Sequence, residues 1–220
     1  LYEVDDISAV ELEEGDPHSP TFTALCYEPF WPGSGKGNNA GSCPRPDDAT
    51  LETELDALIE MNAMLTQGAV DAFTDNDDAL LSHGKNFLFA DFTHDGLKRR
   101  YYPWDLDSVF RRPNASIYGE VSKRGRVTQS PYQDVILNHP GLRDRYNEIM
   151  LALVTPPGPL SKVNLHAFLD ALLPVVDQAI ADDPYINESA SSTIGALKSW
   201  ITARIDSVQT QALVNEPPPR

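Results

Sequence analysis

The chain has 220 residues, of which 41% are hydrophobic, and a formal net charge of −16 at pH 7. This length allows one large domain or two small ones, and the apolar content is sufficient for a hydrophobic core. A surface this acidic repels phosphate, which argues against a nucleic acid or an anionic membrane as the partner. It favours cationic partners or divalent cations, or it simply keeps a secreted protein soluble.

The N-terminal part is poor in regular structure. Residues 1–12 alternate weakly between apolar and polar and predict a short strand, whereas prolines and glycines in residues 13–48 predict a long ordered loop. This loop contains Cys26 and Cys43, for which we expect a disulfide and an oxidising compartment, with two free thiols as the alternative. Neither a signal peptide nor an apolar run long enough to span a membrane is predicted. Because residue 1 is Leu1 rather than Met, we expect a processed or truncated chain.

Helical periodicity begins near residue 48 and dominates the rest of the chain. The predicted helices cover 50–61, 62–73, 161–180 and 190–213, and a further helix opens with Ser130 as its cap and Pro131 at the first position and carries an apolar stripe over 142–153. We expect their apolar stripes to form the core. The predicted organisation is a strand remnant with a Pro/Gly-rich loop at 1–47, a helical body at 48–213 and a tail at 214–220. The fold class is therefore α+β and mainly α.

The stretch 75–110 is the densest mixture of acids, amides and aromatic residues in the sequence. An acidic loop leads into an apolar strand near 86–91, a polar turn follows, and a second strand near 99–104 ends at Trp104-Asp105. The resulting β-hairpin would bring both of its acidic ends together. Carboxylates with an amide between them are suited to a divalent metal and a phosphate chain.

The candidate site residues of this hairpin are Asp78, Asn86, Asp105 and Asp107. Protein kinases place a catalytic-loop Asp, then an Asn, then a metal-binding Asp beyond a short hairpin, and this chain has the same order. Asn86 follows Asp78 by eight positions (86 − 78). Neither a His-Arg-Asp nor an Asp-Phe-Gly motif is present.

Two segments of the sequence are similar to the signature of a known family. Residues 78–89, together with Pro-Trp-Asp-Leu-Asp at 103–107, resemble the core signature of the CotH family, the spore-coat-protein-H-type atypical kinases. The helical segments 141–146 and 197–204 are also similar, and the likeness covers roughly residues 48–212. It implies a protein-kinase-like C-terminal lobe in which the hairpin carries the metal-binding acids. It also implies ATP with Mg²⁺ (or Mn²⁺ or Ca²⁺), phosphorylation of protein hydroxyls, and a secreted or cell-surface bacterial protein.

The resemblance assigns a role to each site residue. Asp78 would be the catalytic-loop acid, and Asp105 the main metal-binding acid. Asn86 would be a second metal ligand, with Asp107 as a further candidate ligand. Lys85, Asn86 and Asp105 would contact the nucleotide. The nucleotide-clamping N-terminal lobe of such kinases would precede Leu1, so an upstream fragment is an expected partner beside the protein substrate.

Two other hypotheses remain open. The chain could be a non-catalytic secreted interaction or structural protein that keeps the fold, with its Asp cluster binding Ca²⁺ or no ligand. Alternatively, the acids could have purely structural roles, with Asp77 or Asp78 capping a helix and Asp105 capping a turn. Paired acids would also suit a glycosidase, whereas Ser82 beside His83 lacks the motif of a nucleophilic serine. The basic segment 111–129 is either a solvated loop or a surface for an anionic ligand.

Overall fold

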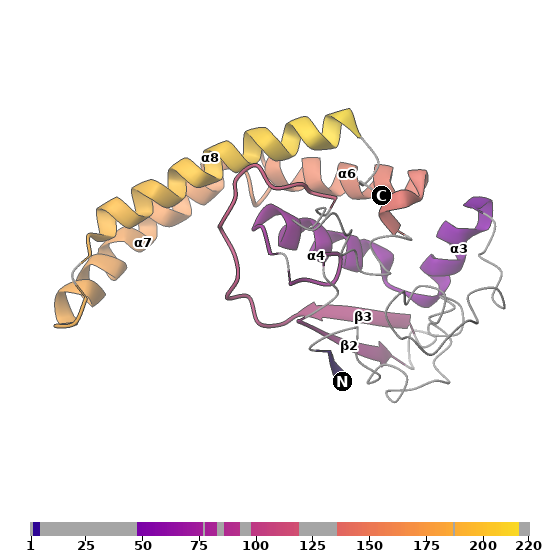
Figure 1. Cartoon of the computed structure of the whole chain (residues 1–220), viewed down its shortest axis with the longest axis horizontal. Coiled ribbons are helices and arrows are strands. Elements are labelled where there is room, and N and C mark those ends of the chain that lie inside the picture. The colour runs from indigo at the N-terminus through magenta and orange to yellow at the C-terminus, as the bar shows by residue number, and fades with distance from the viewer. Residues whose placement is uncertain are drawn as a thin grey trace, which may run out of the picture.

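The computed structural model describes residues 2–4, 48–76, 78–82, 86–92, 98–118, 136–186 and 188–215 (Figure 1). Its elements are β1 (Tyr2–Val4), α3 (Asp48–Leu58), α4 (Met61–Phe73), β2 (Phe87–Phe92), β3 (Lys98–Pro103), α6 (Pro140–Val154), α7 (Lys162–Asp182) and α8 (Ala190–Val214). The predicted helices and hairpin are confirmed, with most ends within a few residues. The exception is the start predicted at Ser130-Pro131, which lies outside the described residues, whereas α6 begins at Pro140. The mainly helical α+β fold class is confirmed as well.

The sheet has three antiparallel strands in the order β1-β2-β3. Phe89 is central, since it faces Tyr2 of β1 on one side and Tyr101 of β3 on the other. Phe87, Phe89 and Tyr101 are buried, which follows the period of two expected of strands with one face against a core. In Figure 1, α4 lies directly above β3, and α6 and the C-terminal half of α8 lie above α4.

The junction of α3 and α4 is anchored on β3 by a buried arginine. Glu60 N donates to the backbone oxygen of Arg99 at 2.9 Å, and Ile59 forms a parallel bridge with the same residue. The Arg99 guanidinium lies over the Phe89 ring, 4.0 Å from its centroid. A cation held over an aromatic face in this way can be buried at a lower cost.

The core forms where α4 meets α6 and α8. Helix α4 is buried on both sides because it lies between the sheet and the other helices. The apolar stripes predicted on α4, on α6 and on the C-terminal half of α8 are confirmed as core. Their fully or almost fully buried members include Met64, Leu65, Phe73, Leu142, Tyr146, Met150, Val154, Ile205 and Val208.

Local signals set the ends of the helices. His139 precedes α6 and its Nδ1 accepts from Leu142 N at 3.2 Å, with Pro140 at the first helical position. Helix α8 ends at Asn215, whose left-handed backbone (φ 55°) is a typical helix terminus. The Asn215 side chain then accepts from Asn147 Nδ2 at 2.8 Å, which ties the end of α8 to α6.

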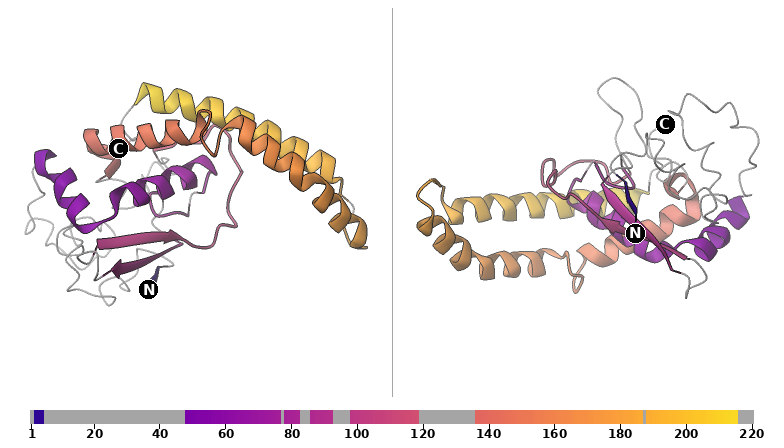
Figure 2. Two further views of the ribbon diagram at one scale, coloured as in Figure 1. Left: turned by 180° about the vertical axis from the view of Figure 1, so that it is seen from behind. Right: turned by 90° about the horizontal axis from the view of Figure 1, so that it is seen from below.

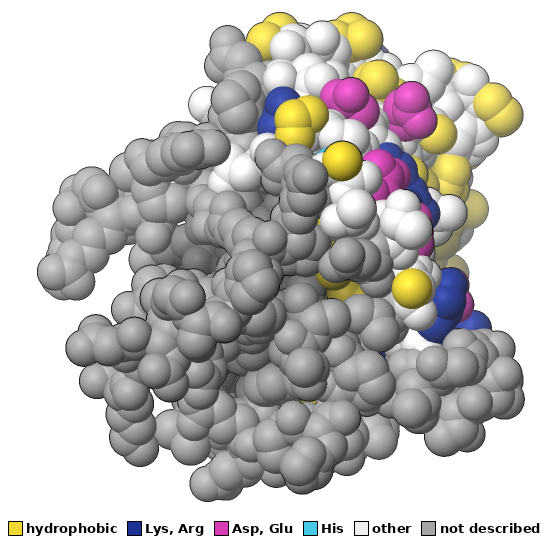
Figure 3. All heavy atoms as spheres, turned by 90° about the vertical axis from the view of Figure 1, so that its right-hand side faces the viewer, with side chains coloured by type: hydrophobic (Ala, Val, Ile, Leu, Met, Phe, Trp, Pro, Cys, Tyr) yellow, Lys and Arg dark blue, Asp and Glu magenta, His cyan; other side chains and the backbone are white. Residues whose placement is uncertain are grey.

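Ion pairs join α6 to α3 on the surface. Arg145 Nη1 lies 2.8 Å from Asp56 Oδ2 and 3.5 Å from Glu52 Oε1. The hydrogen bond with Asp56 is the main cause that raises the pKa of Arg145. Figure 3 views the molecule from the right-hand side of Figure 1, and acidic and basic side chains lie next to each other on the described surface that it shows.

Helices α7 and α8 leave the rest of the molecule as an antiparallel pair, here called the arm: α7 with residues 190–199 of α8 (Figures 1 and 2). The expectation that the α7 stripe is core is confirmed in full for Leu169, the one residue of α7 that is buried, and in part for Leu165 and Leu173, which are half-buried against the core. It is wrong for Phe168. Phe168 is 59% exposed and Val175 is 65% exposed. The physical reason is that α7 packs along a single partner helix, which covers only one narrow face.

By length and composition alone, α7 is long and apolar enough to cross a membrane, so the expectation of no such run is wrong by that criterion. The helix also carries Asp170 and Asp177, and Asp170 pairs with Lys198 of α8. A helix that packs on a neighbour and carries charged side chains along its length passes the same criterion. The feature is therefore weak evidence for a membrane span.

A tight turn at 155–161 joins α6 to the arm. Leu160 N donates to Leu153 O at 2.9 Å, and the Pro156–Pro157 peptide bond is cis. Gly158 is buried, and a Cβ at this position would lie 2.2 Å from Ala152 O and 2.3 Å from Leu153 O. Backbone atoms cannot give way as a flexible side chain does, so the turn requires glycine here.

Some sequence predictions fall outside the described residues. These are residues 13–47 of the predicted loop with the Cys26–Cys43 disulfide, the Asp77 cap, and residues 119–129 of the basic segment. The division at 1–47, 48–213 and 214–220 stays a prediction.

Candidate functional site

The hairpin brings two of the predicted site residues to one end of the sheet. Asn86 immediately precedes β2, and Asp105 comes two residues after β3. Phe87 faces Pro103 across the ladder, and Trp104 N donates to the backbone oxygen of Asn86 at 3.1 Å. The register of the hairpin therefore places Asn86 beside the Trp104-Asp105 dipeptide, although the two residues are far apart in sequence.

Both residues have a left-handed backbone. The φ angle is 50° at Asn86 and 52° at Asp105. Asn and Asp adopt this conformation more readily than other residues with a side chain, and such positions are enriched at functional sites. The turn at each strand end therefore explains in part why these positions are Asn and Asp, beside their predicted role as metal ligands.

Three further site residues were predicted. Asp78 is half-buried in the turn 78–82, and Asp107 is exposed beyond β3. Lys85 is outside the described residues. Within the described ranges, no group of three or more His, Cys, Asp or Glu side chains lies close enough to hold a metal ion.

The donor atoms at this end of the hairpin still fit a magnesium ion bound with a phosphate chain. Mg²⁺ is usually held by one or two carboxylates, and substrate phosphates and water complete its coordination. Asp105 is exposed and Asn86 is half-buried, so the carboxylate and amide oxygens are of the right type for such a site. These residues do not form a site in which several protein carboxylates alone coordinate the metal.

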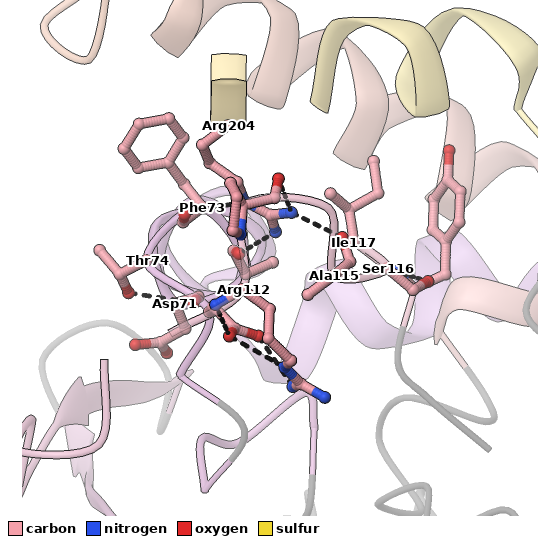
Figure 4. A network of polar contacts seen from close by, with 12 residues as sticks. Asp71, Phe73, Thr74, Arg112, Ala115, Ser116, Ile117 and Arg204 are labelled. Carbon is pink, nitrogen blue, oxygen red and sulfur yellow. Dashed lines mark hydrogen bonds and ion pairs between the residues drawn. The ribbon is translucent and has the colours of Figure 1, made fainter. Parts of the chain in front are cut away.

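One acid of the predicted loop has a structural role. Asp75 is buried, has a left-handed backbone (φ 57°), and accepts two side-chain hydrogen bonds from Arg112, at 2.9 Å from Nη2 and 3.1 Å from Nε. Arg112 N donates to the same carboxylate at 2.8 Å. In addition, Phe110 N donates to Thr74 O at 2.7 Å. The chain that follows Asp105 is therefore fastened to the end of α4, as Figure 4 shows for Arg112.

A second arginine was missed by the sequence reasoning. Arg204 of α8 is fully buried, and its guanidinium donates to Phe73 O at 3.0 Å and to Ala115 O at 2.6 Å (Figure 4). It also donates to Ala72 O and to Pro113 O. The last carbonyls of a helix have no partner within the helix, so Arg204 satisfies the end of α4 and joins it to residues 113–115. The available signal was a lone arginine within an apolar stripe.

Comparison with known families agrees with this architecture. Residues 38–208 match the model of the family described as CotH kinase protein. The chain belongs to the CotH kinase family. The match spans the hairpin, α4, α6, α7 and most of α8. No similar sequence was found among curated proteins.

Membership of this family confirms the resemblance on which the site was assigned, and it suggests a kinase-like function. Family membership by itself does not establish what a particular site does. The roles of Asp78, Lys85, Asn86, Asp105 and Asp107 therefore stay predictions.

Proposed function

We propose that this CotH-family chain transfers a phosphoryl group from ATP to protein hydroxyls with the help of a divalent metal. The observation that supports this most is the hydrogen bond from Trp104 N to Asn86 O, at 3.1 Å, which brings Asn86 and Asp105 to one end of the hairpin. Phosphoryl transfer needs little covalent chemistry from the protein. It needs positioned oxygen ligands for the metal and a group near the attacking hydroxyl.

Each residue then has one task. Asp105 and Asn86 hold the metal, with Asp107 as a further candidate ligand, and the metal neutralises charge on the phosphate chain. Lys85 contacts the phosphates, and Asp78 accepts the hydroxyl proton of the substrate protein. The fixed backbone at Asn86 and Asp105 supports these roles, because ligands on a rigid turn lose little entropy on binding.

The proposal includes partners and a location. The substrate is a protein, and an upstream N-terminal lobe contributes the other half of the nucleotide site. The metal is Mg²⁺, with Mn²⁺ or Ca²⁺ as substitutes. The protein acts outside the bacterial cytoplasm, as a secreted or cell-surface enzyme with a disulfide between Cys26 and Cys43.

The test is nucleotide binding by Asp105→Asn. Calorimetric titration with ATP in the presence and absence of Mg²⁺ should show at least about a tenfold loss of the metal-dependent affinity, because a charged ligand is removed. Asp206→Asn is the matched control, since Asp206 is exposed on α8 and far along the chain from the hairpin. Equal Mg²⁺-dependent affinity in the wild type and Asp105→Asn would refute the proposed site.

A second candidate function is a non-catalytic secreted protein that keeps the fold and binds Ca²⁺ or no ligand. The observation that favours its ligand-free form is that the described residues contain no group of three or more His, Cys, Asp or Glu side chains close enough to hold a metal. Incubation with radiolabelled ATP and an acceptor protein distinguishes the two. Label transfer that is lost in Asp105→Asn supports the kinase, whereas metal binding without transfer supports the second candidate.

A further inference from the structure

A cavity of about 660 Å³ lies between α4 and the chain that leaves β3. One wall comes from α4, including Thr66, Gln67 and Val70, and the other includes Tyr101, Leu106 and Phe110. Small-molecule sites in proteins typically measure about 300–1,000 Å³ and have apolar walls with a few polar groups. The cavity has the size and the lining of such a site.

Two polar groups of α4 in this cavity, the Asp71 carboxyl and the Gln67 amide, are incompletely satisfied. Asp71 lines the cavity with only 5% of the residue exposed, and burial raises the pKa of its carboxyl to about 6, against the smaller lowering effect of the nearby Asn76 and Gln67 amides. Asn76 Nδ2 donates to Asp71 Oδ1 at 3.3 Å. Both amide atoms of Gln67 are buried. The amide lies close enough to Asp71 to lower the pKa of its carboxyl, but neither amide atom has the geometry of a full hydrogen bond with a described residue.

These groups define the chemistry of an occupant. A buried carboxylate that has no cationic partner in the described part of the chain favours a positively charged donor, and planar cations can give it two parallel hydrogen bonds. The buried Gln67 amide, which lacks a full hydrogen bond, favours a ligand whose edge carries both a hydrogen-bond donor and an acceptor. The apolar walls favour a ring. We propose that the cavity binds a small planar molecule with an apolar ring and a cationic N–H edge, held by Asp71 and Gln67.

The entrance allows such a molecule to reach the buried groups. Asn62 and Ala63 at the rim are exposed on α4. Across from them, Leu106 is 52% exposed and Phe110 is 43% exposed. Below this rim lies the almost completely buried Asp71, with Gln67 and Val70 half-buried beside it, so a molecule that enters at the rim can reach the carboxylate.

This site is separate from the one proposed for phosphoryl transfer. Asp78, Asn86 and Asp105 do not line the cavity. Leu106 does, and it directly follows Asp105 in the chain. A bound molecule therefore contacts the segment that carries the main metal-binding acid, while its own binding requires neither ATP nor metal.

Benzamidine is a suitable probe, because it combines a phenyl ring with a planar amidinium. Titration at pH 7.5 in 150 mM salt, where the Asp71 carboxyl is ionised and surface charges are screened, should show saturable binding. Asp71→Asn should weaken it by about tenfold to a hundredfold, the usual range for a charge-assisted hydrogen bond. Neutral benzamide should bind Asp71→Asn at least as well as benzamidine does. Gln67→Leu should weaken benzamidine by about threefold to tenfold.

A steric variant tests the location without changing the polar groups. Ala63→Phe places a ring at the exposed rim of the cavity and should abolish benzamidine binding, whereas Ala196→Phe, on the exposed face of α8, should leave it unchanged. Circular dichroism confirms that each variant is folded. Absence of saturable binding to the wild type, or equal affinity in the wild type and Ala63→Phe, would overturn the proposal. Neither result bears on nucleotide binding at Asp105.

Discussion

Helix α8 passes through two different environments. In its C-terminal half, Arg204, Ile205 and Val208 are buried against α4 and α6. The half at 190–199 packs along α7 in the arm, where Lys198 forms an ion pair with Asp170, whose side chain is 63% exposed. The same helix thus has one end inside a layered core and the other in a two-helix arm.

The difference shows that an amphipathic pattern sets which face of a helix is buried but not how much stability the burial provides. The rest of the molecule, here called the body, has three layers: the sheet, α4, and α6 with the C-terminal half of α8. Arg204 can be fully enclosed there because backbone carbonyls accept hydrogen bonds from its guanidinium. In the arm, each helix has a single neighbour, and much of its apolar surface stays in water. Contributions to stability should therefore fall steeply along α8.

Arg204→Met should have the largest effect. The substitution removes the donor for the carbonyls of Phe73 and Ala115, and an unsatisfied buried carbonyl costs about 1–3 kcal/mol. We expect the free energy of unfolding in urea to fall by about 4 kcal/mol or more. A loss below about 1 kcal/mol would mean that water replaces the arginine, and that the body is not more tightly organised than the arm.

Truncation of two isoleucines on α8 sharpens the comparison. Ile205 is 6% exposed in the body and Ile194 is 8% exposed in the arm. Ile205→Ala should lower the free energy of global unfolding by about 3–4 kcal/mol. Ile194→Ala should mainly speed amide hydrogen exchange in α7 and residues 190–199, because the arm can open without the body. Equal loss of protection in both parts would show that arm and body unfold as one unit.

The pH dependence of stability tests the one buried carboxyl of α4. The pKa of Asp71 is raised by burial to about 6, above its ordinary value of 3.8. Between these values the folded protein keeps a proton that the unfolded chain has released, so the contribution is full below pH 3.8 and is lost as the pH rises toward 6. The loss is on the order of 3 kcal/mol.

Asp71→Asn removes this dependence because an amide does not titrate. Urea denaturation of the wild type and the variant from pH 4 to pH 7 should show that the variant gains stability relative to the wild type across that range. A difference that does not change with pH would mean that Asp71 is as well solvated as an exposed acid.

Lys198→Met should have the smallest effect. Its ion pair with Asp170 lies on the surface of the arm, and exposed pairs contribute about 0–1 kcal/mol. We expect a change below about 1 kcal/mol that decreases further in high salt. A loss as large as that of Arg204→Met would contradict the contrast between the two halves of α8.

The sequence allowed the hairpin and the helices to be predicted because their signals are local. Alternating apolar residues, a polar turn and a stripe on each helix are all readable within a short window. The burial of α7 could not be predicted in the same way. Phe168 and Leu169 belong to the same predicted stripe, but the single helix that packs on α7 covers only the face with Leu169 and leaves Phe168 59% exposed.

The site was partly predictable because part of its geometry also depends on local signals. The hairpin register that brings Asn86 beside Trp104-Asp105 follows from two strands and a turn. The bonds between Asp75 and Arg112 join residues 37 positions apart, across a segment whose path depends on tertiary packing. From sequence, Asp75 therefore looked like one more acid of a metal-binding loop, and the requirement for an arginine partner was not visible.

The turn at Gly158 has a mechanical consequence for the arm. Helix α7 has 21 residues and is thus about 30 Å long. A rotation of only about 10° at this turn would move the far tip of the helix by about 5 Å over that length. A Cβ at Gly158 would meet the carbonyl oxygens of Ala152 and Leu153, so any larger residue here has to shift the turn. Such a shift would be small at the end of α6 and several times larger at Tyr185, near the tip of the arm.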